Sequence, residues 1–351
     1  MATTKKYGAA LAASMLLLLP LSGTCAAAAP AVLSQAAIQS PKALNAAMLA
    51  IANAGSRLVA AGERGVILWS DDAGKTWQQA VTPVQVSLVA LQFVNPTHGW
   101  AVGHLGVVLH TGDGGKTWHK QLDGIQAAQL AARAASGAQA QAAAQGLIDD
   151  GPDKPFLDLY FENERSGYIV GAYNLMFKTE DGGASWQAWQ AHVSNPKSFH
   201  LYGIRAAGDA LYLAGEQGLL FRSADRGQTF EPLASPYKGS YFGLLTAASG
   251  EVLAFGLRGN VFRSSDQGRS WSKVQTGIDV ALASGIELAD GTLVLLSQAG
   301  DVLISRDKGQ SFRPQPGKEA LPLAALAQAR DATLVAAGLR GVKRLAAPAG
   351  P

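Results

Sequence analysis

Six aspartates stand in six copies of one eight-residue pattern, and carboxylates repeated in this way could ligate metal ions or act as catalytic acids. The pattern is [ST]-x-D-x-G-x-[ST]-[WF], and its first copy reads SDDAGKTW at Ser70–Trp77. The carboxylate can instead accept hydrogen bonds from backbone N–H groups a few residues on and so fix a turn. The Gly two places later can supply a positive φ, and the closing Trp or Phe can pack between sheets. We therefore expect structural roles for Asp72, Asp113, Asp181, Asp225, Asp266 and Asp307.

Three arginines, Arg64, Arg258 and Arg340, occupy the third place of short turns such as Gly62-Glu63-Arg64-Gly65. Arginine binds carboxylates through two parallel hydrogen bonds and stacks on aromatic rings, so these side chains could hold an acidic partner. The alternative is that arginine is simply tolerated in an exposed turn. The residues predicted to bind a partner are Arg64, Arg258 and Arg340, together with His104, Tyr173 and Gln217 from the corresponding turns.

Other residue types give no catalytic or metal-binding pattern. The six histidines show no spacing typical of a metal site, and core or surface packing explains the pair around one hairpin, His104 and His110. The sequence contains no phosphate-binding loop and no Gly-x-Ser-x-Gly segment, and its single cysteine is Cys25. We therefore predict no catalytic residue, no metal and no cofactor.

The spacing of the repeated pattern indicates the elements that position these residues. Successive aspartates lie 41, 68, 44, 41 and 41 residues apart, and a period near forty with alternating strands is typical of a β-propeller. One complete unit contains strands at 86–95, 99–104, 106–111 and 117–121. We predict an all-β fold, a seven-bladed β-propeller with Asp-box repeats and a short helical insertion, in a single domain over residues 29–351.

The number of blades follows from the turns, because seven turns stand against six Asp boxes. The segment LVAAGERGVILWS at Leu58–Ser70 nearly coincides with LVAAGLRGVKRLA at Leu334–Ala346, but no box follows the second. The seventh blade therefore lacks its own outer strand. We expect Ala31–Ile38 to supply that strand by pairing near Val342–Leu345, since an open ring would expose two sheet edges.

The long step of 68 residues contains an insertion at Leu122–Pro155 that is rich in Ala and Gln. We expect one or two helices, with Asp123 as an N-cap, over one end of the ring between blades two and three. The insertion could be a tolerated surface segment or a lid that binds a partner.

The N-terminus predicts export. Lys5 and Lys6 precede an apolar run from Gly8 to Leu21, and Ala26-Ala27-Ala28 offers a cleavage site, so residues 1–28 are predicted to be a signal peptide of a periplasmic protein. A lipoprotein anchored through Cys25 is the alternative, although Thr24 stands where a small residue is expected. Removal of two lysines lowers the formal net charge from +3 to about +1, which favours neither nucleic acid nor a membrane surface as partner.

Two segments carry a specific family resemblance: HGWAVGHLGVVLHTGDGGKTW at His98–Trp118 and SGYIVGAYNLMFKTEDGGASW at Ser166–Trp186. They resemble the photosystem II stability and assembly factor family of seven-bladed, Asp-box propellers, over nearly the whole mature chain. The resemblance implies a non-enzymatic chaperone that binds a membrane-protein precursor through an arginine patch. By position the patch maps onto Arg64, Arg258 and Arg340, while blades two, three, four and six have no Arg there.

Asp boxes also resemble those of bacterial neuraminidases, so a glycoside-cleaving or glycan-binding propeller is the alternative function. Sialidase chemistry needs three converging arginines, a Tyr nucleophile with a Glu, and an Asp acid, and the Arg-Ile-Pro segment of that family is absent here. We therefore predict an exported, monomeric, non-enzymatic assembly or stability factor that binds a protein partner, a membrane protein or its precursor, and no nucleic acid.

Overall fold

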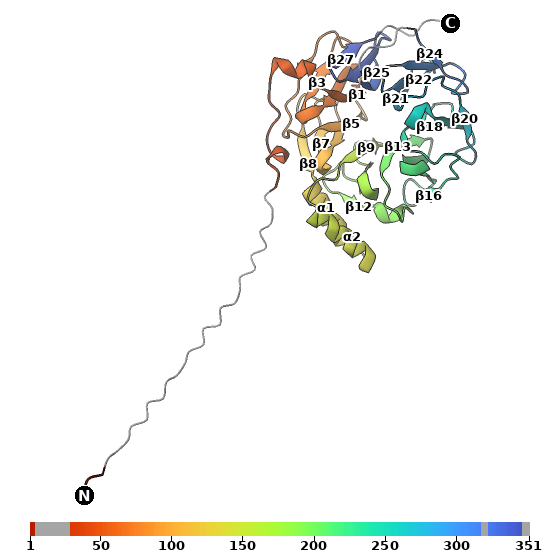
Figure 1. Cartoon of the computed structure of the whole chain (residues 1–351). Coiled ribbons are helices and arrows are strands. Elements are labelled where there is room, and N and C mark those ends of the chain that lie inside the picture. Colours follow the sequence, from red (N-terminus) through yellow and green to blue (C-terminus); the bar gives the residue numbers. More distant parts are fainter. Residues whose placement is uncertain (4–28, 317–321, 346–351) are drawn as a thin grey trace.

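Seven antiparallel sheets surround a central axis in the computed structural model, which describes residues 1–3, 29–316 and 322–345 (Figure 1). This confirms the predicted seven-bladed β-propeller. Within each sheet the strands follow one another in chain order from the axis outward. The predicted signal peptide and Cys25 lie outside the described residues apart from Met1–Thr3, and no helix in the described part of the chain has the length and apolarity needed to cross a membrane.

The first strand of each blade lines the axis and contacts the first strands of the two neighbouring blades. These inner strands are β1 (Met48–Ala54), β5 (Leu88–Phe93), β9 (Phe156–Phe161), β13 (Leu201–Ala207), β17 (Tyr241–Thr246), β21 (Leu282–Glu287) and β25 (Leu323–Gln328). The second strands are β2 (Arg57–Gly62), β6 (Gly99–Gly103), β10 (Gly167–Gly171), β14 (Ala210–Gly215), β18 (Val252–Gly256), β22 (Leu293–Ser297) and β26 (Leu334–Gly338). Almost every residue of these second strands is buried, because both faces of a blade pack against neighbouring blades.

The third and fourth strands lie progressively further from the axis. Third strands are β3 (Ile67–Ser70), β7 (Val108–Thr111), β11 (Met176–Thr179), β15 (Leu220–Ser223), β19 (Val261–Ser264), β23 (Val302–Ser305) and β27 (Gly341–Arg344). Fourth strands are β4 (Gln78–Gln79), β8 (His119–Leu122), β12 (Gln187–Ala188), β16 (Glu231–Pro232), β20 (Ser272–Val274) and β24 (Arg313–Pro314). Blade seven therefore has three strands among the described residues.

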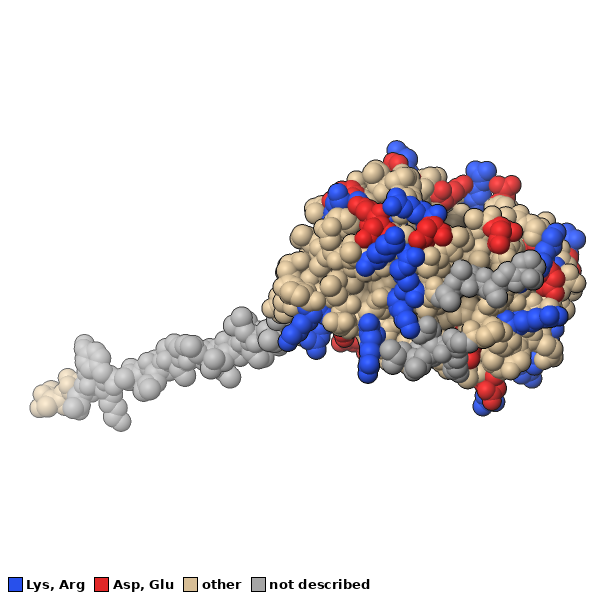
Figure 2. Space-filling view, turned by 90° about the horizontal axis from the view of Figure 1, so that it is seen from above, with Lys and Arg blue, Asp and Glu red and all other residues tan. Residues whose placement is uncertain are grey.

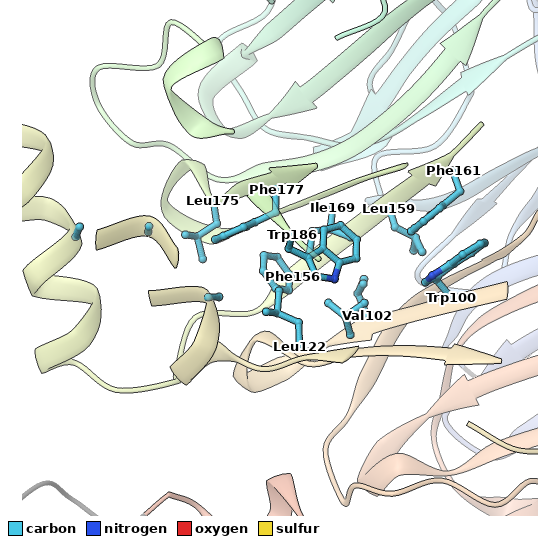
Figure 3. Close-up of a cluster of buried hydrophobic side chains, with 14 residues drawn as sticks. Trp100, Val102, Leu122, Phe156, Leu159, Phe161, Ile169, Leu175, Phe177 and Trp186 are labelled. Carbon is cyan, nitrogen blue, oxygen red and sulfur yellow. The ribbon is translucent and has the colours of Figure 1, made fainter. Parts of the chain in front are cut away.

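The apolar core consists of clusters between neighbouring blades. In the cluster of blades two and three, the ring of Trp100 stacks on Phe161 with 3.7 Å between centroids and an interplanar angle of 8° (Figure 3). Trp186, the closing aromatic of an Asp box, meets Phe161 edge-on from the other side. The aromatic residues thus fill the wedge between two twisted sheets, as predicted for the closing aromatic of the Asp box, whereas the stack of Trp100 on Phe161 was not predicted.

The insertion forms two helices, α1 (Gly124–Ala134) and α2 (Ala138–Asp149). The Asp123 carboxylate accepts hydrogen bonds from the N–H groups of Ile125 and Gln126, and the Gln126 side chain accepts one from the Asp123 N–H, so the predicted N-cap is a complete capping box. The helices do not lie over the end of the ring as expected. Helix α1 contacts β12 at the rim and the turn His104–Gly106 of blade two, and the pair extends outward, with buried alanines of both helices joining the blade two–three cluster (Figure 1).

The expected closing strand is wrong. Ala31–Leu33 forms a short 3₁₀ turn, and the Ala37 N–H donates to the Thr82 carbonyl oxygen in blade one at 3.0 Å. A Cβ on Gly341 of blade seven would lie 2.2 Å from the Leu44 carbonyl oxygen. In blade one, a Cβ on Gly65 would likewise lie 1.9 Å from the carbonyl oxygen of Val84, which belongs to the link between blades one and two. The N-terminal segment therefore takes the place of the link between two blades, and not that of an outer strand.

All six Asp-box carboxylates accept hydrogen bonds within their own turns. In the box of blade five, Asp266 Oδ1 accepts from the Ser270 N–H at 2.9 Å and from the Ser264 hydroxyl at 2.8 Å, and Oδ2 accepts from the Ser270 hydroxyl at 2.6 Å. The Gly of every box has a positive φ, between 77° and 88°. The residue before it also has a positive φ in every box, which the pattern did not predict.

These hydrogen bonds predict a pH-dependent contribution to stability. They favour the ionised carboxylate, chiefly through the Ser270 hydroxyl, and lower the pKa of Asp266 from its ordinary value of 3.8 to about 2. The contribution is present above about pH 4 and is lost as the pH falls through about 2. We expect Asp266→Asn to melt about 2–4 °C below the wild type at pH 7, and this difference to shrink between pH 4 and pH 2. A difference in melting temperature that does not change with pH would show that the negative charge of the carboxylate does not stabilise the turn.

Candidate partner-binding face

All seven turns between second and third strands lie on one face of the propeller, which we term the turn face. In every blade the second turn residue donates its N–H to the carbonyl oxygen of the residue directly before the inner strand. These donor–acceptor pairs are Glu63–Ala47, His104–Ser87, Ala172–Pro155, Glu216–His200, Leu257–Ser240, Gln298–Ala281 and Leu339–Pro322. Each turn is thereby held beside the link between blades at the mouth of the central channel, and the Asp boxes lie on the opposite face.

A glycine at the first turn position makes this approach possible. A Cβ on Gly62 or Gly103 would lie 2.1 Å from the carbonyl oxygen of Ala47 or Ser87, which is closer than atoms can approach. The third turn residue in blades one to five adopts left-handed backbone, with φ between 52° and 56°. Five side chains are therefore presented by the same rigid backbone geometry, and that geometry fixes their direction.

The predicted binding residues are all exposed on the turn face. Arg64, Tyr173, Gln217 and Arg258 are third turn residues in the left-handed conformation, whereas His104 is the second residue of its turn. None of the arginines Arg64, Arg258 and Arg340 has an ion-pair or hydrogen-bond partner for its side chain within the described residues. Their guanidinium groups are therefore available to a ligand.

Arg340 differs from the other two arginines in its backbone. In blade one Ala61 pairs with Ile67, and the turn between them carries Arg64 in left-handed conformation. In blade seven Ala337 pairs with Val342, so that turn is one residue shorter and Arg340 has no positive φ. The expected equivalence of Arg340 with Arg64 is wrong in this respect, although both lie on the turn face.

Two of the three arginines lie on adjacent blades. The inner strands β1 and β25 are in contact, so blades one and seven, which carry Arg64 and Arg340, are neighbours. Arg258 is on blade five, with blade six between it and Arg340. The acidic residues of two of these turns are already engaged: Glu63 Oε1 accepts from the Ala47 N–H at 3.0 Å, and Glu216 Oε2 from the His200 N–H at 3.2 Å. Because these two carboxylates already accept hydrogen bonds within the protein, the arginine side chains are the charged groups of the turns that can bind a ligand.

An aromatic strip, not predicted from the sequence, runs from the turn face into the channel. Tyr173, which is 54 % exposed, meets His200 with ring centroids 4.8 Å apart, and the Lys154 ammonium group lies 5.3 Å from the Tyr173 ring. The strip continues from His200 to Tyr202 at 5.9 Å and from Tyr202 to Phe242 at 5.6 Å. The signal available in the sequence was the presence of aromatic residues at the start of two successive inner strands.

The central channel is a cavity of about 270 Å³ lined by all seven inner strands. Most of its lining residues are apolar, and Tyr202 and Phe242 stand among them. The single carboxylate among its described lining residues, Asp158, is buried and paired with Arg205, and it also accepts the Ile204 N–H at 2.9 Å. Burial raises the pKa of Asp158, while Arg205 opposes that shift. The described lining residues therefore include one carboxylate, whereas the cleavage of glycosides uses a pair.

Comparison with known proteins identifies the family. The model of the family described as "Photosynthesis system II assembly factor YCF48" matches residues 75–136 and 139–318, more than half of the chain. The chain belongs to this family. A "Photosystem II assembly lipoprotein Ycf48" of Synechococcus sp. (strain CC9902) is 34% identical over 77 residues, which are 22% of this chain and 23% of that relative, so the matched region spans about a quarter of the relative's length.

Solved structures of the YCF48 family share the fold. The structure titled "YCF48 bound to D1 peptide" covers 88% of this chain and 94% of its own, with a TM-score of 0.64 and 17% identity. YCF48 from Cyanidioschyzon merolae gives a TM-score of 0.63 at 14% identity, over 87% of this chain and 96% of its own. The WD40 propeller domain of Doa1 gives 0.63 at 11% identity, over 89% of this chain and 95% of its own. These likenesses establish the propeller, and a family outside YCF48 shares it equally.

Proposed function

We propose that this protein is an exported, non-enzymatic assembly factor that binds a segment of a protein partner on its turn face. The observation that carries the proposal is the set of three exposed arginines, none of them paired within the described residues, on turns held rigidly at one end of the ring. Family membership supports an assembly function, and a structural relative is described as bound to a peptide. The fold alone would not support it.

The partner that fits this face carries carboxylates on an accessible, extended segment, because guanidinium groups bind carboxylates in bidentate geometry. We propose a membrane protein or its precursor, with His104, Tyr173 and Gln217 as further contacts around the ring. The factor is expected to act as a monomer. The neuraminidase-like alternative receives no support from the channel, where Asp158 is the one carboxylate among the described lining residues and is bound to Arg205.

Export also belongs to the proposal. The two lysines and the apolar run before residue 28 support translocation. The name of the Synechococcus relative describes a lipoprotein, which favours lipid attachment at Cys25 more strongly than the sequence did. Both a lipid-anchored and a released protein would present the turn face to partners at the membrane surface.

Site-specific photo-crosslinking tests which face binds. Gln217 lies on the turn face of blade four, and Gln228 lies in the Asp box of the same blade, so the two exposed glutamines form a matched pair on opposite faces. A photoreactive amino acid at position 217 should crosslink to a membrane protein in solubilised membranes of the source organism, and one at position 228 should not. Equal crosslinking from both positions, or crosslinking from position 228 alone, would overturn the proposal.

A further inference from the structure

Blade seven leaves one edge of its sheet open. In the other six blades a fourth strand covers the third strand, whereas β27 pairs with β26 and, within the described ranges, with no other strand. An open edge presents unpaired N–H and C=O groups and is a template for strand addition. The edge of β27 therefore needs an occupant, or a device that blocks it.

The register shows which backbone groups point outward. The Leu345 N–H donates to the Leu334 oxygen of β26 at 2.8 Å, and the backbone groups of an antiparallel strand alternate in direction. Val342 and Arg344 therefore direct their N–H and C=O groups away from β26. Val342 pairs with Ala337 as Ile67 pairs with Ala61 in blade one, and the Ile67 oxygen accepts the Ala80 N–H, which follows the fourth strand, at 2.8 Å.

The N-terminal segment does not provide the missing strand. The Ser40 N–H donates to Gln79 Oε1 at 3.0 Å, and the Gln79 Nε2 group donates to the Ile38 oxygen at 2.9 Å, so this stretch is held on blade one. The short 3₁₀ helix Pro41–Asn45 contacts β27, and its Leu44 oxygen lies against Gly341 at the beginning of that strand.

An available basic side chain lies beside this edge. Arg340, in the turn directly before β27, is exposed and has no side-chain partner among the described residues, whereas Lys343 and Arg344 already have partners, Arg344 pairing with Asp331 at 3.0 Å. Figure 2 shows the side of the molecule that carries blades six, seven and one, where Lys and Arg side chains lie over the middle and Asp or Glu side chains stand beside the upper ones. Charge complementarity therefore favours an acidic occupant.

We propose that the open edge of β27 accepts a short, extended, acidic segment of a partner protein as the fourth strand of blade seven. Fourth strands in the other blades are two to four residues long, so a comparably short stretch suffices. Main-chain hydrogen bonds to Val342 and Arg344 supply affinity, and the neighbouring Arg340 guanidinium group selects acidic side chains. The inference rests on the proposed function in one respect: the occupant belongs to the partner protein.

A labelled synthetic peptide, STWEVEL, tests the proposal. It keeps Thr117, Trp118 and Leu122 of the blade-two segment KTWHKQL at 116–122, with Glu in place of His119 and Gln121, Ser in place of Lys116 and Val in place of Lys120. The mature full-length protein should bind it, as measured by fluorescence anisotropy, and Val342→Pro should bind it about tenfold more weakly because proline removes one outward N–H and disturbs the edge. Val342→Ala, the matched control, keeps the N–H and should bind within about twofold. Equal binding by Val342→Pro and the wild type would overturn the proposal.

A second arm leaves the protein unaltered. A twin of the peptide with N-methyl groups on the alternate residues whose N–H groups would face β27 cannot donate to the β27 carbonyl oxygens in that register, and it should bind the wild type about tenfold more weakly. Equal binding of the two peptides would contradict strand addition, even if Val342→Pro fails to fold.

A variant ending at Leu345 should bind the peptide as the wild type does. Binding that becomes tenfold tighter after this truncation would show that the chain's own tail occupies the edge, and a dimer that Val342→Pro dissociates would place a second copy there; either result overturns the proposal.

The outcomes separate this inference from the proposed function. Crosslinking from position 217 without binding of STWEVEL would leave the partner-binding face intact and refute strand addition. Binding of STWEVEL that depends on the Val342 N–H, without crosslinking from position 217, would support the edge site and refute the turn face.

Discussion

Replacement of Trp100 by alanine should cost about 3–5 kcal/mol of the free energy of unfolding, the range for removing a fully buried large aromatic side chain. Trp100 is fully buried in β6, and its ring stacks on Phe161 of the next blade. Its indole N–H donates to the Gly182 oxygen at 3.2 Å, so the substitution also removes one of the two hydrogen bonds that this carbonyl accepts, the other coming from Gln121 Nε2 at 2.8 Å. The loss combines a cavity with a broken link between blades two and three.

Chemical denaturation of the two proteins measures this difference, and Trp271→Ala is the matched control. Trp271 closes the Asp box of blade five and is only partly buried, so its removal should cost clearly less. A loss below about 1 kcal/mol for Trp100→Ala would show that the stack between the two blades contributes little and that each blade is stabilised within itself.

Local chemistry explains what the sequence could predict. The Asp box needs only a carboxylate, a hydroxyl and a glycine within eight residues, so six boxes and their spacing indicate the propeller without knowledge of distant contacts. The capping box at Asp123 is local in the same sense. Even here the pattern missed one feature, because Arg226 and Gln267 adopt positive φ although neither is glycine. The turn's hydrogen bonds impose a backbone that side-chain type alone does not reveal.

Ring closure depends on contacts between the two ends of the chain, and the sequence was a poor guide to it. Ala31–Ile38 has the apolar character of a strand, but Ala37 binds blade one and Leu44 packs against Gly341. The spacing from Leu44 to β1 matches that from Val84 to β5, since each precedes its inner strand by four residues. The number of residues between this segment and β1 therefore determines that it forms the link between two blades. Strand propensity contains no information about that separation.

The positions of the turns that carry the candidate binding residues were predicted in part. The turns that carry Arg64 and Arg258 lie between second and third strands, as expected. The turn of Arg340 is shorter because of the register between β26 and β27, which the sequence alone did not predict. The aromatic strip joins Tyr173 in a turn with Tyr202 and Phe242 on two inner strands. Such a set becomes visible only when neighbouring blades are placed side by side.

Loss of the three arginines should abolish capture of the partner and leave the fold unchanged. Exposed charge pairs contribute about 0.2–1 kcal/mol each, so the loss of three together should weaken binding by a factor between about 3 and about 150. Salt screens exposed charges, and capture by the wild type should therefore weaken as ionic strength rises. Arg64 and Arg258 already have positive φ, and alanine meets the same backbone strain as arginine. The melting temperature should accordingly stay close to that of the wild type, because exposed turn residues rarely change stability by more than about 0.5 kcal/mol.

The most direct test compares two triple variants for capture of the crosslinked membrane partner. One variant carries Arg64→Ala, Arg258→Ala and Arg340→Ala on the turn face, and the other carries Lys75→Ala, Arg226→Ala and Arg269→Ala on the Asp-box face. Both lose the same number of positive charges, so a difference reports position and not net charge. We predict that capture and its salt dependence are lost in the turn-face variant and retained in the Asp-box variant. Equal capture by the two variants at low salt would contradict a binding site on the turn face.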